Sequence, residues 1–114
     1  MTDWQQMVTD MNGLTRTLRG LQPEVMRAFA DMSRAATADG ALDAKTKELL
    51  ALGISVAVRC DPCIAYHSRA AVKAGATEAE IAETLGMAIY MGAGPSVMYA
   101  AKALEAAQSW PREG

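Results

Sequence analysis

The 114-residue sequence has few aromatic residues, no excess of basic charge, only two cysteines and a single histidine. Aromatic residues make up 5% of the chain, which disfavours a β-sandwich, because sheets are rich in aromatic and β-branched side chains. The net charge is −2, so we expect no nucleic-acid partner, since such partners select a basic surface. The polar start, MTDWQQM, lacks the apolar segment of a signal peptide, and we therefore expect a cytoplasmic protein.

Small and flexible apolar residues take the place of the missing aromatics. Hydrophobic residues make up 51% of the sequence, with alanine at 23 positions and methionine at eight. Alanine is the best helix former, because its side chain loses no rotamer freedom in a helix. The apolar content excludes disorder and the length is typical of one domain. We therefore expect residues 1–114 to form a single all-α domain.

Capping residues and helical spacing predict a compact bundle of about six helices. Thr2 opens a capping box at the start of the first helix, and Thr77 opens a second one at the start of the fifth helix. Asp61 and Pro62 are expected to be the cap and the first residue of the fourth helix. Residues 111–114 remain as a tail. The predicted helices cover residues 2–20, 23–39, 43–58, 61–75, 77–92 and 95–108.

Residues 84–101 carry no charged side chain and approach the length of a membrane-spanning helix. Gly92, Gly94 and Pro95 interrupt this stretch, which predicts two buried helices around a turn, and we expect no membrane partner. So long an uncharged stretch in so short a chain also favours burial against another subunit.

The two cysteines and the histidine occur within eight residues, in the order Cys60-x-x-Cys63-x-x-x-His67. With Asp61 as the cap, Cys63 lies in the first turn of a helix, where free amides and the helix dipole favour a thiolate. His67 follows one turn later on the same face and is placed to act as a general base. A thiolate attacks peroxides to form a sulfenic acid, and Cys60 is placed to condense with it to a disulfide.

Other interpretations of the cysteine pair remain open. A structural zinc site needs four ligands, and Cys60, Cys63 and His67 supply three unless a second subunit contributes. Haem attachment needs a histidine at position 64, where this chain has Ile64. Two inert, buried cysteines are also possible, although they leave the nearby histidine unexplained. We therefore expect neither a metal nor a cofactor.

Three ordered segments carry a family resemblance: KELLAL at 47–52, the cysteine and histidine motif at 60–67, and AGATEAEI at 74–81. Between Asp43 and Leu104 the sequence resembles the carboxymuconolactone decarboxylase superfamily, and the cysteine pair points to its alkyl hydroperoxidase D (AhpD)-like branch. The resemblance implies an all-α homo-oligomer, either a trimer or a hexamer. It also implies an antioxidant peroxidase or disulfide-reductase cycle through the two cysteines, with a peroxide or disulfide substrate and a lipoyl-type or other thiol electron donor.

The resemblance further implies that a glutamate twelve residues before the first cysteine belongs to a proton relay, and Glu48 occupies that position. Twelve helical residues span about 18 Å, so Glu48 reaches the site only if the next helix packs back antiparallel or a neighbouring subunit donates it. Antiparallel packing predicts a link between Glu48 and His67, direct or through water. Pro62 departs from the family pattern, because a relay histidine precedes the second cysteine in the best-known members.

Two further functions remain open. Lactone decarboxylation, the reaction that names the superfamily, has no need of a redox dithiol, and the cysteine pair counts against it. A non-enzymatic, oligomeric redox sensor, whose disulfide changes its assembly, fits the motif as well.

Overall fold

Five α-helices make up most of residues 1–112, which are the residues that this computed structural model describes. Within that range there is no strand, so the predicted all-α class is confirmed. Glu113 and Gly114, the end of the predicted tail, lie outside the described residues. The helices are α1 (Trp4–Leu21), α2 (Pro23–Thr37), α3 (Ala44–Ala57), α4 (Asp61–Lys73) and α5 (Glu78–Ser109).

The fifth and sixth predicted helices form one element, α5, which changes direction at Ala93. Ala93 has a φ of 53° and a ψ of −137°, outside the helical region. A Cβ added to Gly92 would lie 1.9 Å from the Ser96 hydroxyl, so the bend depends on glycine at this position. Both predicted helices are present and the break between them lies where the sequence placed it, so five elements stand where about six were expected because a single non-helical residue separates the last two. No helix of the described range is long and apolar enough to cross a membrane.

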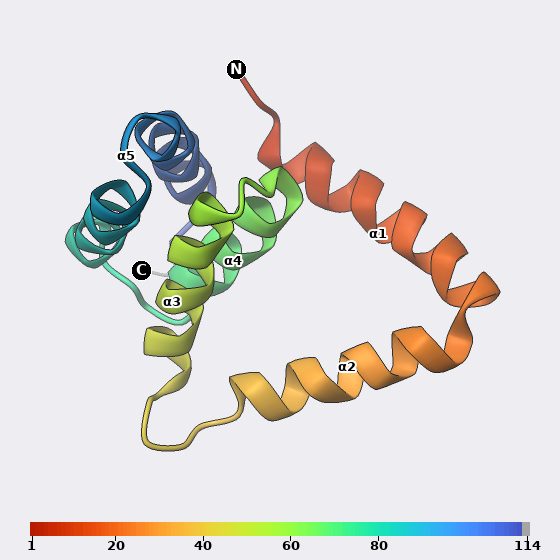
Figure 1. The fold of residues 1–114 in the computed structure, drawn as a ribbon. Helices are drawn as coiled ribbons and strands as arrows, with labels where there is room; N and C mark the ends of the chain where they lie inside the picture. The colour runs from red at the N-terminus through yellow and green to blue at the C-terminus, as the bar shows by residue number, and fades with distance from the viewer. Residues whose placement is uncertain (113–114) are drawn as a thin grey trace.

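The core lies between α3, α4 and α5, with the first turns of α1 closing one side (Figure 1). Trp4 of α1 is almost completely buried there, and its indole Nε1 donates to Glu105 Oε1 at 2.8 Å. Alanine fills much of the space between the helices, which allows them to approach closely. The other large, fully buried hydrophobic side chains are Leu52, Val56, Ile64 and Ile81.

The rest of α1 and all of α2 extend away from the core, and we call residues 12–37 the α1–α2 arm (Figure 1). No residue of α2 is buried, and α1 is buried only at Trp4 and Val8. Val25, Phe29 and Met32 recur at helical spacing on one side of α2, yet each is 58–62% exposed. The arm is therefore an amphipathic structure whose apolar side is left uncovered by the rest of residues 1–112.

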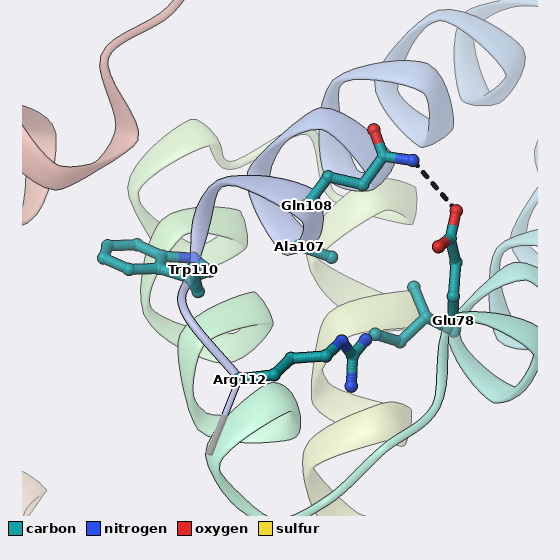
Figure 2. Close-up of a pocket in the computed structure, with 6 residues that line it drawn as sticks. Glu78, Ala107, Gln108, Trp110 and Arg112 are labelled. Atoms are coloured by element: carbon teal, nitrogen blue, oxygen red, sulfur yellow. Dashed lines mark hydrogen bonds between the residues drawn. The ribbon is translucent and has the colours of Figure 1, made fainter. Parts of the chain in front are cut away.

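The C-terminal segment packs back on the end of α4 (Figure 2). The Trp110 indole donates to the Ser68 hydroxyl at 3.0 Å, and the Arg69 guanidinium lies 5.8 Å from the centroid of the Trp110 ring. The Arg112 guanidinium donates to the carbonyl of Ala76, just beyond α4. These contacts fix the second half of α5 against α4.

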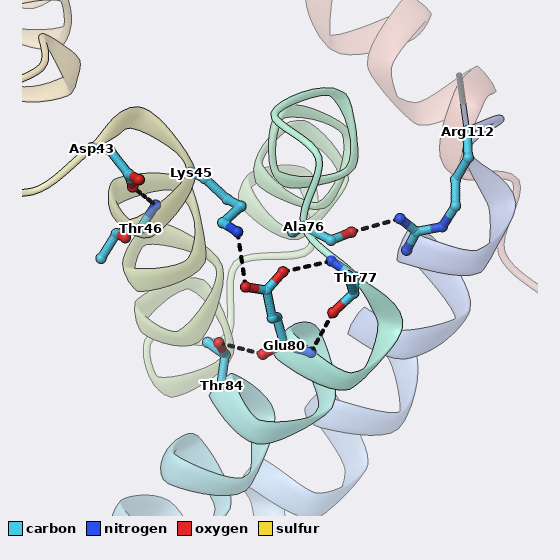
Figure 3. A network of polar contacts seen from close by, with 8 residues as sticks. All are labelled: Asp43, Lys45, Thr46, Ala76, Thr77, Glu80, Thr84 and Arg112. Carbon is cyan, nitrogen blue, oxygen red and sulfur yellow. Dashed lines mark hydrogen bonds and ion pairs between the residues drawn. The ribbon is translucent and has the colours of Figure 1, made fainter. Parts of the chain in front are cut away.

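Side-chain caps set where the helices begin. The predicted capping box at the start of α5 is present: Thr77 Oγ1 accepts the Glu80 N–H at 3.1 Å, and a Glu80 carboxylate oxygen accepts the Thr77 N–H at 2.8 Å (Figure 3). The first helix is capped by Asp3, which accepts the Gln6 N–H at 2.9 Å, so the prediction of Thr2 is wrong. Asp3 accepts from an amide of the first turn, whereas Thr2 precedes the cap by one residue.

Candidate active site

A three-residue connection between α3 and α4 positions the cysteine pair. The N–H of Cys60 donates to the Ser55 carbonyl at 3.1 Å, and the N–H of Arg59 donates to the Val56 carbonyl at 3.2 Å. This is a Schellman motif, in which the residue after the helix adopts a left-handed conformation. Arg59 does so with a φ of 59°. Cys60 therefore closes α3 and opens α4 at the same time.

The sulfurs of Cys60 and Cys63 are joined as a disulfide, with their Cα atoms 5.2 Å apart. Cys60 is the N-cap of α4, and its Sγ accepts the Cys63 N–H at 3.2 Å. The predicted cap, Asp61, is wrong: Cys60 has the extended conformation of a cap residue (φ −110°, ψ 100°), and Asp61 is the first helical residue. Cys63 lies in the first turn, as predicted. The free amide at this helix end nevertheless points at the Cys60 sulfur, so the helix end no longer favours Cys63 over Cys60.

His67 lies one turn beyond Cys63 and contacts Glu48 of α3. Its Nδ1 is 2.9 Å from Glu48 Oε2, which is the direct contact that antiparallel packing predicted. The Glu48 side chain is 14% exposed and that of His67 is 35% exposed. Since a carboxylate only accepts hydrogen bonds, the neutral imidazole donates from Nδ1, and its Nε2 carries the lone pair that can take a proton.

An ion pair that sequence reasoning missed lies next to the cysteines. Lys102 Nζ of α5 donates to a carboxylate oxygen of Asp61 at 2.5 Å. The hydrogen bond to Asp61 raises the pKa of Lys102, with desolvation opposing the effect. The same ammonium lies 5.0 Å from the centroid of the Tyr99 ring. The two partners are 41 residues apart, and no motif or periodicity in the sequence connects them.

The N-terminal half of α1 borders the motif. A shallow hollow of about 420 Å³ has Pro62 on one side and the first turns of α1 on the other. Tyr66 ties the two helices together, because its hydroxyl donates to the side-chain oxygen of Asn12. The hollow combines two thioether side chains with two carboxylates, and its lining residues are Thr2, Asp3, Gln6, Met7, Asp10, Met11 and Pro62.

A second crevice, of about 220 Å³, lies beside the C-terminal segment and involves none of the four residues predicted for the site (Figure 2). Its lining includes Glu78, Gln108 and Arg112. Over residues 1–112, no three His, Cys, Asp or Glu side chains are grouped so as to hold a metal ion. The one imidazole in this part of the chain, that of His67, contacts the Glu48 carboxylate and lies one helical turn from Cys63 at the start of α4.

Solved structures with similar folds come from two bacteria. The crystal structure of an apo carboxymuconolactone decarboxylase family protein from Legionella pneumophila has 48% sequence identity and a TM-score of 0.91, covering 94% of this chain and 96% of its own. A crystal structure from Thermotoga maritima has 34% identity and a TM-score of 0.70, covering 75% of this chain and 77% of its own.

Sequence relatives and a family model agree with these structures. An uncharacterised protein from Cupriavidus necator is 42% identical over 90% of this chain and 91% of its own length. One from Haemophilus influenzae is 41% identical over 92% of this chain and 93% of its own. The model of the carboxymuconolactone decarboxylase family matches residues 23–106. The chain therefore belongs to the carboxymuconolactone decarboxylase family.

Proposed function

We propose that the protein is a thiol-dependent peroxidase or disulfide reductase of the AhpD-like kind, with Cys63, Cys60, His67 and Glu48 as its active site. The observation that carries the proposal is a disulfide-bonded cysteine pair at a helix start, with a histidine–carboxylate pair one turn away. A thiol becomes nucleophilic only as its thiolate, so a nearby proton acceptor is what this chemistry requires.

In the first half of the cycle, Cys63 is the attacking thiol, because His67 lies one turn away from it on the same helix. His67 Nε2 takes the thiol proton, and Glu48 stabilises the imidazolium through Nδ1. The thiolate attacks the distal oxygen of a hydroperoxide and the O–O bond breaks. Cys63 becomes a sulfenic acid, and the leaving oxygen takes the proton back from His67 as an alcohol, or as water when the substrate is hydrogen peroxide.

In the second half, the Cys60 thiol condenses with the Cys63 sulfenic acid to form the disulfide and release water. An external dithiol, of lipoyl or similar chemistry, then exchanges with this disulfide: the donor becomes a disulfide and the two cysteines become thiols. The bonded pair seen here corresponds to the oxidised end of the cycle. Pro62 has no proton to relay, so we expect thiol–disulfide exchange to be more efficient than peroxide turnover.

We further propose that the protein acts as a homo-oligomer, a trimer or hexamer, in which the α1–α2 arm of one copy covers apolar surface of another. The chain exposes 7278 Å², whereas a compact protein of 12.1 kDa exposes roughly 6,000 Å². The excess exceeds the ~800 Å² per partner that a standard interface buries. A second copy also supplies the complementary surface, because α3, its C-cap Val58 and α5 carry exposed apolar side chains of their own: Leu50, Ile54, Val58, Met87, Tyr90, Met91 and Met98.

Turnover and trapping experiments on cysteine variants test the catalytic proposal. The reduced protein is supplied with hydrogen peroxide or cumene hydroperoxide, with dihydrolipoamide as reductant, and peroxide loss is followed. Cys63→Ser should abolish turnover, whereas Cys60→Ser should form one trappable sulfenic acid per chain and then stop. Serine is a favoured N-cap, so Cys60→Ser keeps the helix start and isolates the loss of the thiol.

Three results would overturn part or all of this assignment. A sulfenic acid trapped only on Cys60 would exchange the roles of the two cysteines. Lactone decarboxylation that survives in the Cys60→Ser/Cys63→Ser double variant would replace the redox function altogether. Stoichiometric oxidation without turnover, by either peroxide or disulfide, would instead identify a redox sensor.

A further inference from the structure

Asp61 places a negative charge in the same helical turn as both sulfurs. It follows Cys60 directly and precedes Cys63 by two residues, as the first residue of α4. A carboxylate suits the positive end of a helix, but it repels a thiolate formed beside it. The motif therefore contains a group whose charge opposes the reactive form of its own cysteines.

Lys102 is held where it neutralises that charge. Its ammonium contacts the Asp61 carboxylate at 2.5 Å, and the side chains are 38% and 29% exposed. Ala100 and Ala103, which flank Lys102 on α5, are buried against the core, so the backbone that carries the lysine is fixed. The Tyr99 ring contacts the ammonium from its own helix at 5.0 Å. Lys102 is thus tied to the motif by packing and charge, unlike an ordinary surface lysine.

The other charged groups around the cysteines do not perform this task. On α4 and α3, His67 and Glu48 pair with one another. On α1, the carboxylates of Asp3 and Asp10 line the hollow beside Pro62 and add to the negative charge. The remaining charged residues nearest to the motif are Arg59 in the connection, which is exposed, and Glu105 of α5, which accepts from Trp4.

We propose that Lys102 is a positioning residue that acts through Asp61 to set the acidity of the cysteine thiols and the reduction potential of the Cys60–Cys63 couple. The inference rests on the proposed function only in taking the cysteine pair to be redox-active. A thiolate stabilised by its surroundings favours the reduced state. Loss of Lys102 therefore leaves Asp61 unbalanced, raises the thiol pKa and makes the dithiol a stronger reductant. Loss of the Asp61 charge leaves the Lys102 ammonium unbalanced, which lowers the thiol pKa and makes the dithiol a weaker reductant.

Because the two substitutions are expected to have opposite effects, they distinguish an electrostatic role of the ion pair from a structural one. If the ion pair only held α4 against α5, removing either partner would disturb the motif in the same direction. We therefore compare Lys102→Gln with Asp61→Asn, with Lys102→Arg as the conservative variant and with the double variant. Lys73→Gln, which removes the same charge from the last turn of α4, serves as the matched control.

The measurement is the equilibrium with glutathione, in which the dithiol and oxidised glutathione give the protein disulfide and two molecules of reduced glutathione. Alkylation and mass spectrometry give the fraction of each form. Lys102→Gln should move the equilibrium toward the disulfide by about three- to tenfold, where tenfold corresponds to about 30 mV. Asp61→Asn should move it the other way, while Lys102→Arg, Lys73→Gln and the double variant stay near wild type. The rate of thiol alkylation against pH should move to higher pH in Lys102→Gln and to lower pH in Asp61→Asn.

Shifts of the same sign in the two single variants, or no shift in either, would overturn the proposal. If Lys102→Gln fails to fold, Asp61→Asn still carries a prediction of definite sign. The glutathione equilibrium does not depend on peroxide consumption. If the protein turns over no peroxide and the two variants still shift the equilibrium in opposite directions, the role of Lys102 is supported and the peroxidase function is contradicted. A wild-type pair that does not exchange with glutathione or dihydrolipoamide would overturn both proposals together.

Discussion

Nδ1 of His67 lies 2.9 Å from Oε2 of Glu48, although 19 residues separate them in the sequence. After the short connection, α4 runs antiparallel beside α3. An early residue of α3 therefore lies next to a central residue of α4. The carboxylate holds the ring through Nδ1 and leaves Nε2 outside this contact. In the proposed cycle the two side chains therefore act as one unit.

A double-mutant cycle tests that unit. Glu48→Gln and His67→Ala should each lower kcat/KM for the hydroperoxide by about 10²–10⁴-fold, the range of a lost general base. The double variant should lose no more than the stronger single variant, because either change removes the oriented base. Steady-state rates at constant dihydrolipoamide give the three values, with Glu83→Gln, an exposed carboxylate of α5, as the control. Losses that multiply would show that Glu48 and His67 act independently.

Local patterns in the sequence predicted the parts of the site that depend on neighbours along the chain. The spacing of Cys60, Cys63 and His67, the Thr77 capping box and the break near Gly92 all involve residues within a few positions of one another. The cap of α4 was assigned to Asp61 because aspartate is a favoured cap and cysteine is not. Which residue is the N-cap depends on the backbone conformation, here that of Cys60, and side-chain propensity does not determine that conformation.

Contacts between distant helices were harder to predict. The link between Glu48 and His67 followed from one geometric condition, the antiparallel return of α4. The link between Lys102 and Asp61 had no such condition, because the register of α5 against α4 depends on the packing of many alanines. The helical spacing that predicts α2 likewise does not show which surface covers its apolar positions, such as Phe29.

Phe29→Glu tests whether the α1–α2 arm is an assembly surface. Phe29 is 58% exposed on a helix with no buried residue, so a charge there removes no buried packing within residues 1–112. Light scattering should report a smaller particle than wild type. Far-UV circular dichroism should lose helicity, because a 15-residue helix with few tertiary contacts is marginal in water. Arg27→Gln, which changes the net charge equally on another face of α2, should leave both unchanged. An unaltered mass for Phe29→Glu would exclude the arm as the interface.

Glu80 should make the start of α5 sensitive to acid. Its carboxylate accepts the Thr77 N–H at 2.8 Å and the Lys45 ammonium at 2.9 Å, and these bonds, the backbone one first, hold the pKa of Glu80 below its ordinary value (Figure 3). A lowered folded-state pKa means that the contribution to stability is complete above the unfolded-state value of about 4.3. It is lost as the pH falls through the folded-state pKa.

Thermal unfolding of Glu80→Gln at several pH values measures this contribution. The variant should have a lower Tm than wild type at pH 7, and the difference should shrink as the pH falls below about 4. Lys45→Met, which keeps the capping box and removes only the ion pair, should show a smaller difference at pH 7. A Tm difference that does not change with pH would mean that the charge of Glu80 contributes nothing.

Arg59→Gly should stabilise the protein, because Arg59 holds a left-handed conformation (φ 59°) that costs a residue with a side chain about 1–2 kcal/mol. The corresponding position after α4 is already occupied by Gly75, with a φ of 91°. Part of the gain is offset by the greater freedom of glycine in the unfolded chain, so the expected increase in the free energy of unfolding is about 0.5–1 kcal/mol. Urea unfolding of the disulfide form, at one fixed protein concentration, gives this value.

Arg59→Ala removes the same charge but keeps the Cβ, and it should show no gain. Equal stability of the two variants would mean that the backbone at this position is not strained, and that any effect of Arg59→Gly comes from the lost charge beside Cys60.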